Sequence, residues 1–118
     1  MEWKSKKIIN SFKYAIEGVT TSLKKERNMK IHILIMCLVI VAGIVLDITK
    51  LEWCVCIILF GLVIGAELFN TAIETTVDMI TSEKDEKAKI VKDVSAGAVL
   101  VIAISSAIVG LIIFVPKI

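Results

Sequence analysis

Residues 67–78 read ELFNTAIETTVD and stand at the end of a long, mostly apolar run over residues 51–66. Within this stretch Glu67, Asn70, Glu74 and Asp78 recur at helical spacing. At roughly 100° per residue, the four positions fall within about 80° of one another on a helix. Carboxylates are costly in or beside hydrocarbon, so an acidic face on a membrane helix indicates a functional site. Such a face suits a metal, phosphate chemistry or a proton relay better than it suits packing.

The composition predicts a membrane protein. The chain has 118 residues, of which 57% are hydrophobic, and its mean hydropathy is +0.86. This is too apolar for a soluble domain, and the length allows about three helical spans of roughly 20 residues each. We therefore expect an all-α membrane protein that forms a single unit over residues 1–118. No cleavable signal is expected, because the N-terminal region is rich in lysine and lacks an apolar core segment.

Three membrane spans are expected, at about residues 31–46, 51–69 and 94–115. The second span should continue as a cytoplasmic helical extension to residue 80. The short link before Leu51 makes the first two spans an antiparallel hairpin. The charged run over residues 82–92 predicts a solvated loop before the third span.

The N-terminal segment, at about residues 5–25, predicts an amphipathic helix at the membrane surface. Its apolar residues can line one side of a helix that lies at the level of the headgroups; they are Ile8, Ile9, Phe12, Ala15, Ile16, Val19 and Leu23. A plain membrane anchor explains the same pattern equally well.

The distribution of basic residues predicts the orientation. Eight lysines and arginines precede the first span and four lie within residues 84–92, whereas the first loop and the C-terminus carry one each. By the positive-inside rule, the N-terminus and the second loop are cytoplasmic and the C-terminus is outside. We thus expect a multi-pass protein of the cell (inner) membrane.

The polar groups are expected to lie at one depth, near the cytoplasmic face of the membrane. If Trp53 anchors the second span at the outer interface, Glu67 lies about 21 Å further along the helix, at the inner-leaflet boundary of a core about 30 Å thick. Glu74 lies about 10 Å beyond Glu67, toward the cytoplasm. Glu26 precedes the first span, and Lys92-Asp93 precede the third. The predicted site therefore straddles lipid and water, as an enzyme needs when it joins a lipid hydroxyl to a water-soluble donor.

Each of these side chains can be given a chemical role. Glu67, nearer the lipid, could accept a proton from a substrate hydroxyl. Glu26 and Glu74 offer oxygen ligands for Mg²⁺, which commonly takes one or two carboxylates together with substrate phosphates. Lys92 can pair with a phosphate as a point charge. Phosphoryl transfer needs mainly positioning and charge neutralisation, and these groups supply both.

A small proton-coupled transporter subunit is the alternative from another class. An intramembrane glutamate such as Glu67 would serve there as well. The remaining acids and Lys92 favour an enzyme, because they gather at one surface and do not trace a path across the bilayer.

These residues also carry a family resemblance that covers nearly the whole chain. The matching stretches are ERN at 26–28 with His32; AELFNTAIE at 66–74 with Val77 and Asp78; and Ala88, Lys92 and Asp93 followed by AGAVL at 96–100. The chain resembles the small prokaryotic diacylglycerol kinases, which are trimeric integral-membrane lipid kinases. The resemblance implies three transmembrane helices, an N-terminal surface helix and a homotrimer with sites shared between subunits.

The resemblance also implies roles for individual residues. MgATP would be the donor, Glu67 the general base in contact with the lipid alcohol, and Glu26 and Glu74 the metal ligands. The residues implied to lie near the nucleotide are Lys7, Tyr14, Glu26, Glu74, Glu83, Lys84, Asp85, Lys92 and Asp93. Lys7 stands where the family can have an arginine. Asn70 and Asp78 would support the site, and no nucleic-acid partner is expected.

The lipid substrate depends on the branch of the family. His32 stands where the best-known Gram-negative members have a glutamate, and the chain looks more like the Gram-positive branch. That branch is implied to phosphorylate undecaprenol, so undecaprenol is the expected substrate, with diacylglycerol, giving phosphatidic acid, as the alternative. His32 itself is interpreted as a polar residue at the membrane boundary.

Overall fold

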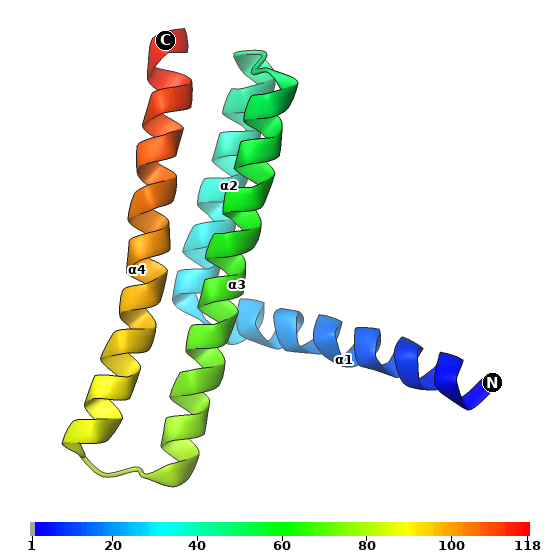
Figure 1. Ribbon diagram of the computed structural model, residues 1–118, viewed down its shortest axis with the longest axis vertical. Helices are drawn as coiled ribbons and strands as arrows, with labels where there is room; N and C mark the ends of the chain where they lie inside the picture. The colour runs from blue at the N-terminus through cyan, green and yellow to red at the C-terminus, as the bar shows by residue number, and fades with distance from the viewer. Residues whose placement is uncertain (1) are drawn as a thin grey trace.

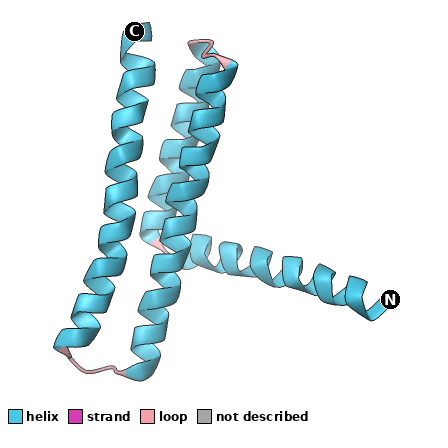
Figure 2. Cartoon of the chain, viewed as in Figure 1, coloured by secondary structure: helices cyan, strands magenta, loops and turns pink. Residues whose placement is uncertain are grey.

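The computed structural model describes residues 2–118, and its regular structure is helical throughout (Figures 1 and 2). The helices are α1 (Glu2–Lys25), α2 (Arg27–Val45), α3 (Lys50–Ile80), α4 (Glu86–Phe114) and a terminal 3₁₀ turn, η1 (Val115–Lys117). The expected all-α architecture is confirmed.

Three of the helices are long and apolar enough to cross a membrane. The helical segments Arg27–Val45, Lys50–Ile80 and Glu86–Lys117 each contain an 18-residue stretch of high mean hydropathy, with values of 2.2, 2.1 and 3.0 in turn. They run side by side, with the α2–α3 turn and the C-terminus at one end and the α3–α4 loop at the other (Figure 1). This confirms the prediction of three helices able to span a bilayer.

Helix α1 lies crosswise to the other three and projects away from them at the point where α2 begins (Figure 1). Helices α3 and α4 continue well past the level of α1. The apolar residues Ile9, Phe12 and Ile16 of α1 are 64%, 68% and 65% exposed. An exposed apolar surface of this kind needs lipid or another protein to cover it.

The turn between α2 and α3 is fixed by local hydrogen bonds. Thr49 accepts from the backbone N–H of Glu52, and the Glu52 carboxylate accepts from the N–H of Thr49, so the two form a capping box. Lys117 lies 3.1 Å from the Glu52 carboxylate and ties the end of the chain to the start of α3. Close packing of the hairpin requires Gly43, because a Cβ there would lie 2.7 Å from the Trp53 ring.

The loop between α3 and α4 is shorter than the sequence suggested. The prediction of a solvated loop over residues 82–92 is wrong from residue 86 onward, because α4 begins at Glu86. Asp85 caps the helix by accepting from the backbone N–H groups of Lys87 and Ala88, at 2.8 and 3.1 Å. Lys and Glu are good helix formers, so a charged run is equally compatible with an exposed helix. Lys92 and Asp93 therefore project from a helix.

Candidate active site

Glu67 on α3 is buried within the single chain, with 1% of its surface exposed. Its Oε2 lies 3.5 Å from Nε2 of His32 on α2. The sequence interpretation took His32 only as a polar residue at the membrane boundary, whereas the structure brings it against the predicted base. A shielded carboxylate costs free energy unless its surroundings compensate it. A buried carboxylate that lies beside an imidazole, as Glu67 does, is therefore typical of a functional site.

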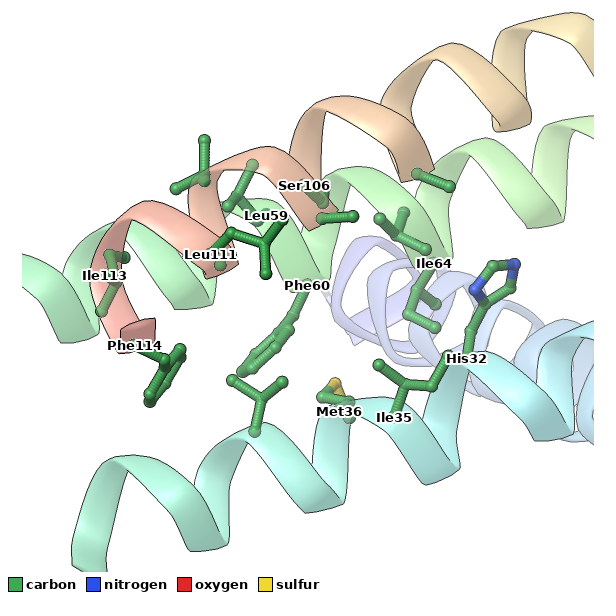
Figure 3. Close-up of a pocket in the computed structure, with 16 residues that line it drawn as sticks. His32, Ile35, Met36, Leu59, Phe60, Ile64, Ser106, Leu111, Ile113 and Phe114 are labelled. Atoms are coloured by element: carbon green, nitrogen blue, oxygen red, sulfur yellow. The ribbon is translucent and has the colours of Figure 1, made fainter. Parts of the chain in front are cut away.

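An apolar crevice of about 440 Å³ runs between α2, α3 and α4. Figure 3 shows His32 at one end and Phe114 at the other, with Met36 and Phe60 between them. Its volume is within the range of roughly 300–1,000 Å³ that is usual for small-ligand sites. Because His32 also contacts Glu67, the polar end of the crevice is the end at which the buried carboxylate lies.

One helical turn beyond Glu67, a polar contact joins α3 to α4. Asn70 is buried, and its Oδ1 accepts a hydrogen bond of 2.7 Å from Ser95 Oγ on α4. The other side of the amide, Nδ2, donates to Glu74 Oε1 at 3.4 Å. Ser95 was missed by reasoning from the sequence. It lies three residues after Lys92 and so shares its helical face, which was a signal that could have found it.

Further along α3, Asp78 contacts Lys92 of α4. Lys92 Nζ donates to Asp78 Oδ1 at 2.6 Å. In this part of α4, outside the expected span, the hydrogen bond to Asp78 raises the pKa of Lys92 above its ordinary value. The charge of nearby Glu74 contributes in the same direction. Lys92 therefore stays positively charged, and it lies near both Glu74 and Asp78.

The expected nucleotide-binding residues are only partly brought together. A polar surface pocket of about 580 Å³ lies at the α3–α4 loop, and its lining includes Asp78, Glu83, Lys84, Asp85, Lys92 and Asp93. Lys7 and Tyr14 lie on α1, which projects away from α3 and α4 of the same chain (Figure 1). Glu26 occupies the break between α1 and α2, where it is half-buried and its backbone is extended.

The acids do not form a self-contained metal cage. Over residues 2–118, no three histidine, cysteine, aspartate or glutamate side chains gather closely enough to hold a metal ion. A cation at this site would therefore need ligands from elsewhere, such as phosphate oxygens, in addition to carboxylates of this chain.

The fold and the site define a class: small helical membrane proteins with a shielded carboxylate between an apolar crevice and a charged surface pocket. Within that class, the sequence model of the family described as prokaryotic diacylglycerol kinase matches residues 13–114. The chain therefore belongs to the prokaryotic diacylglycerol kinase family, as the resemblance of its motifs implied.

Relatives with curated names agree with this assignment. The chain is 40% identical to an undecaprenol kinase of Bacillus subtilis, over 94% of this chain and 90% of that protein. It is 38% identical to a diacylglycerol kinase of Synechocystis, over 92% of this chain and 63% of the relative. A diacylglycerol kinase of Haemophilus influenzae is 33% identical, over 89% of this chain and 86% of the relative. The expectation of a kinase is confirmed.

Proposed function

We propose that the chain phosphorylates the hydroxyl of undecaprenol with ATP, giving undecaprenyl phosphate and ADP at the cytoplasmic surface of the membrane. The observation that carries the proposal is the buried Glu67 beside His32, at the polar end of an apolar crevice. A long-chain alcohol matches this arrangement, because its hydroxyl would reach the carboxylate while the first part of its chain occupies the crevice. The name of the Bacillus relative supports undecaprenol as that alcohol.

In this proposal Glu67 is the general base. Its carboxylate takes the proton of the lipid hydroxyl as the oxygen forms a bond to the γ-phosphorus of ATP, and the bond from that phosphorus to the bridging oxygen of ADP breaks. Burial excludes water from the carboxylate, which reduces competing hydrolysis of ATP. His32 holds one oxygen of the base in place from the neighbouring helix.

The nucleotide would bind in the charged pocket at the α3–α4 loop. Lys92 is charged, lies near Glu74, and would pair with a phosphate when it leaves Asp78. Glu26 and Glu74 would hold Mg²⁺, and the ion would supply positive charge that offsets the negative charge of the donor phosphates. Two carboxylates fit this ion, because Mg²⁺ is usually held by one or two carboxylates together with substrate phosphates and water.

The proposed assembly is a homotrimer with shared sites. Lys7 and Tyr14 are exposed on a helix that leads away from the bundle of their own chain, so their place near a nucleotide is best explained by a neighbouring subunit's site. The apolar residues exposed on α1 also suit a helix that lies on the cytoplasmic membrane surface. This orientation leaves the C-terminus outside, as the positive-inside rule predicts.

Diacylglycerol is the second candidate substrate, because two of the compared relatives bear that name. The function is tested by incubating purified protein in mixed micelles with radiolabelled ATP, Mg²⁺ and a lipid alcohol. We expect label in an organic-extractable phosphate ester that disappears when EDTA removes the metal. Absence of labelled lipid with every alcohol offered would contradict the kinase proposal and reopen the transporter alternative.

A further inference from the structure

The contact between Ser95 and Asn70 lies beside the proposed phosphate chemistry and crosses from α4 to α3. Ser95 is 8% exposed, Asn70 is 7% exposed, and their side chains meet at 2.7 Å. Ser95 is the only one of the three partners on α4, because Asn70 and Glu74 both belong to α3. The serine hydroxyl therefore links α4 to a series of hydrogen-bonded groups on α3. That series ends at the carboxylate of Glu74, which is proposed to hold Mg²⁺.

The chemistry of the three groups decides which way the Asn70 amide faces. A carboxylate can only accept hydrogen bonds, so the side of the amide that faces Glu74 must be the donating NH₂ group. The carbonyl oxygen then faces Ser95, and the serine O–H is the donor that satisfies it. If the amide turned over, its oxygen would lie against the Glu74 carboxylate, and two acceptors would repel each other.

We infer that Ser95 is a positioning residue for the metal site: it fixes the Asn70 amide so that Nδ2 holds the Glu74 carboxylate, which would bind the cation, in one orientation. The inference rests on the proposed role of Glu74 as a Mg²⁺ ligand. Hydrogen bonds to a metal-ligating carboxylate fix its direction, and loss of such an outer partner typically weakens metal affinity about 10- to 100-fold. Ser95 contacts the Asn70 amide, so its proposed effect on the metal site is indirect.

The test measures cation binding without turnover. The full-length protein, in detergent micelles with a non-hydrolysable ATP analogue, is titrated with Mn²⁺ as a paramagnetic substitute for Mg²⁺, and bound ion is measured by electron paramagnetic resonance. We expect Ser95→Ala to raise the Kd for Mn²⁺ about tenfold. Ser105→Ala is the matched control, because it makes the same chemical change at an exposed position of α4; it should leave the Kd unchanged.

A double-mutant cycle separates positioning from a general loss of packing. If Ser95 acts through Asn70, then Ser95→Ala should change the Kd by less than about twofold in an Asn70→Ala background. Equal effects of Ser95→Ala in both backgrounds would overturn the inference, as would an unchanged Kd in Ser95→Ala alone. Size-exclusion profiles of the variants establish that each one is folded.

The outcomes also separate this inference from the proposed function. If the wild-type protein transfers no phosphate to any lipid but Ser95→Ala still weakens Mn²⁺ binding through Asn70, the kinase proposal fails and the positioning role stands. If transfer proceeds normally and Mn²⁺ binding is unaffected by Ser95→Ala, the positioning role fails and the kinase proposal stands.

Discussion

The carboxylate of Glu67 lies 3.5 Å from the imidazole of His32, across the contact between α3 and α2. This pair connects the apolar crevice to the polar face of α3. His32 also lines the apolar crevice, whereas Glu67 begins the polar face of α3 that continues through Asn70 and Glu74. A substrate with an apolar chain and a hydroxyl head would therefore meet the carboxylate where the crevice ends.

The first prediction concerns Glu67 as the base. Glu67→Gln keeps the size of the side chain and removes the proton acceptor, so we expect kcat to fall about 10²- to 10⁴-fold. The affinity for MgATP should be almost unchanged, because Glu67 does not hold the nucleotide. Steady-state transfer assays combined with equilibrium nucleotide binding measure both quantities. Glu52→Gln, in the first turn of α3, is the control and should retain turnover.

Near-normal turnover in Glu67→Gln would remove this residue from the reaction. Loss of nucleotide binding together with turnover would instead assign Glu67 to the donor site.

The second prediction concerns His32. His32→Leu keeps most of the volume but leaves the Glu67 carboxylate without its polar neighbour, so we expect kcat to fall about 10- to 100-fold through misplacement of the base. The KM for ATP should not change. His32→Gln retains an N–H donor and should keep most of the activity. Equal losses in the leucine and glutamine variants would argue against a positioning role for the imidazole.

The third prediction concerns the charge at Lys92. Lys92→Gln should raise the KM for ATP about tenfold or more, because it removes a charge-assisted hydrogen bond to the phosphates. The variant also leaves Asp78 without its cation, and the resulting repulsion of phosphate acts in the same direction. Lys87→Gln, an exposed change on the same helix, is the control. An unchanged KM in Lys92→Gln would mean that the nucleotide binds elsewhere.

The fourth prediction tests whether the crevice holds the lipid chain. Ala103 lines the crevice on α4, so Ala103→Leu should fill part of it. We expect the KM for undecaprenol to rise by about tenfold, equivalent to roughly 1.4 kcal/mol of lost binding, with the KM for ATP unchanged. Ala98→Leu adds the same atoms at an exposed position of α4 and should have no effect. Equal KM values for the two variants would exclude the crevice as the lipid site.

Much of this architecture follows from the sequence, because hydropathy over about 20 residues reports a span directly. The polar face of α3 was also predictable, since the spacing of Glu67, Asn70 and Glu74 depends only on helical geometry. The start of α4 was not, because a charged run forms an exposed helix as readily as a loop. The structure places its first turn at Glu86.

Contacts between side chains of different helices could not be predicted from local sequence patterns. Periodicity defines which residues share a face, but it does not define how that face is rotated toward a neighbouring helix. The pairs His32–Glu67 and Ser95–Asn70 both depend on such rotations. For the same reason Ser95 remained unnoticed as one small polar residue at the start of an apolar segment, although its spacing from Lys92 was visible.

The central claim is that this chain is a lipid kinase that prefers undecaprenol, and competition between substrates tests it most directly. Undecaprenol and diacylglycerol are offered together in the same mixed micelles with labelled MgATP, and the two phosphorylated products are separated and counted. We predict that undecaprenyl phosphate predominates, with a kcat/KM ratio of roughly tenfold or more in its favour. Predominant labelling of phosphatidic acid, or no label in either lipid, would contradict the account.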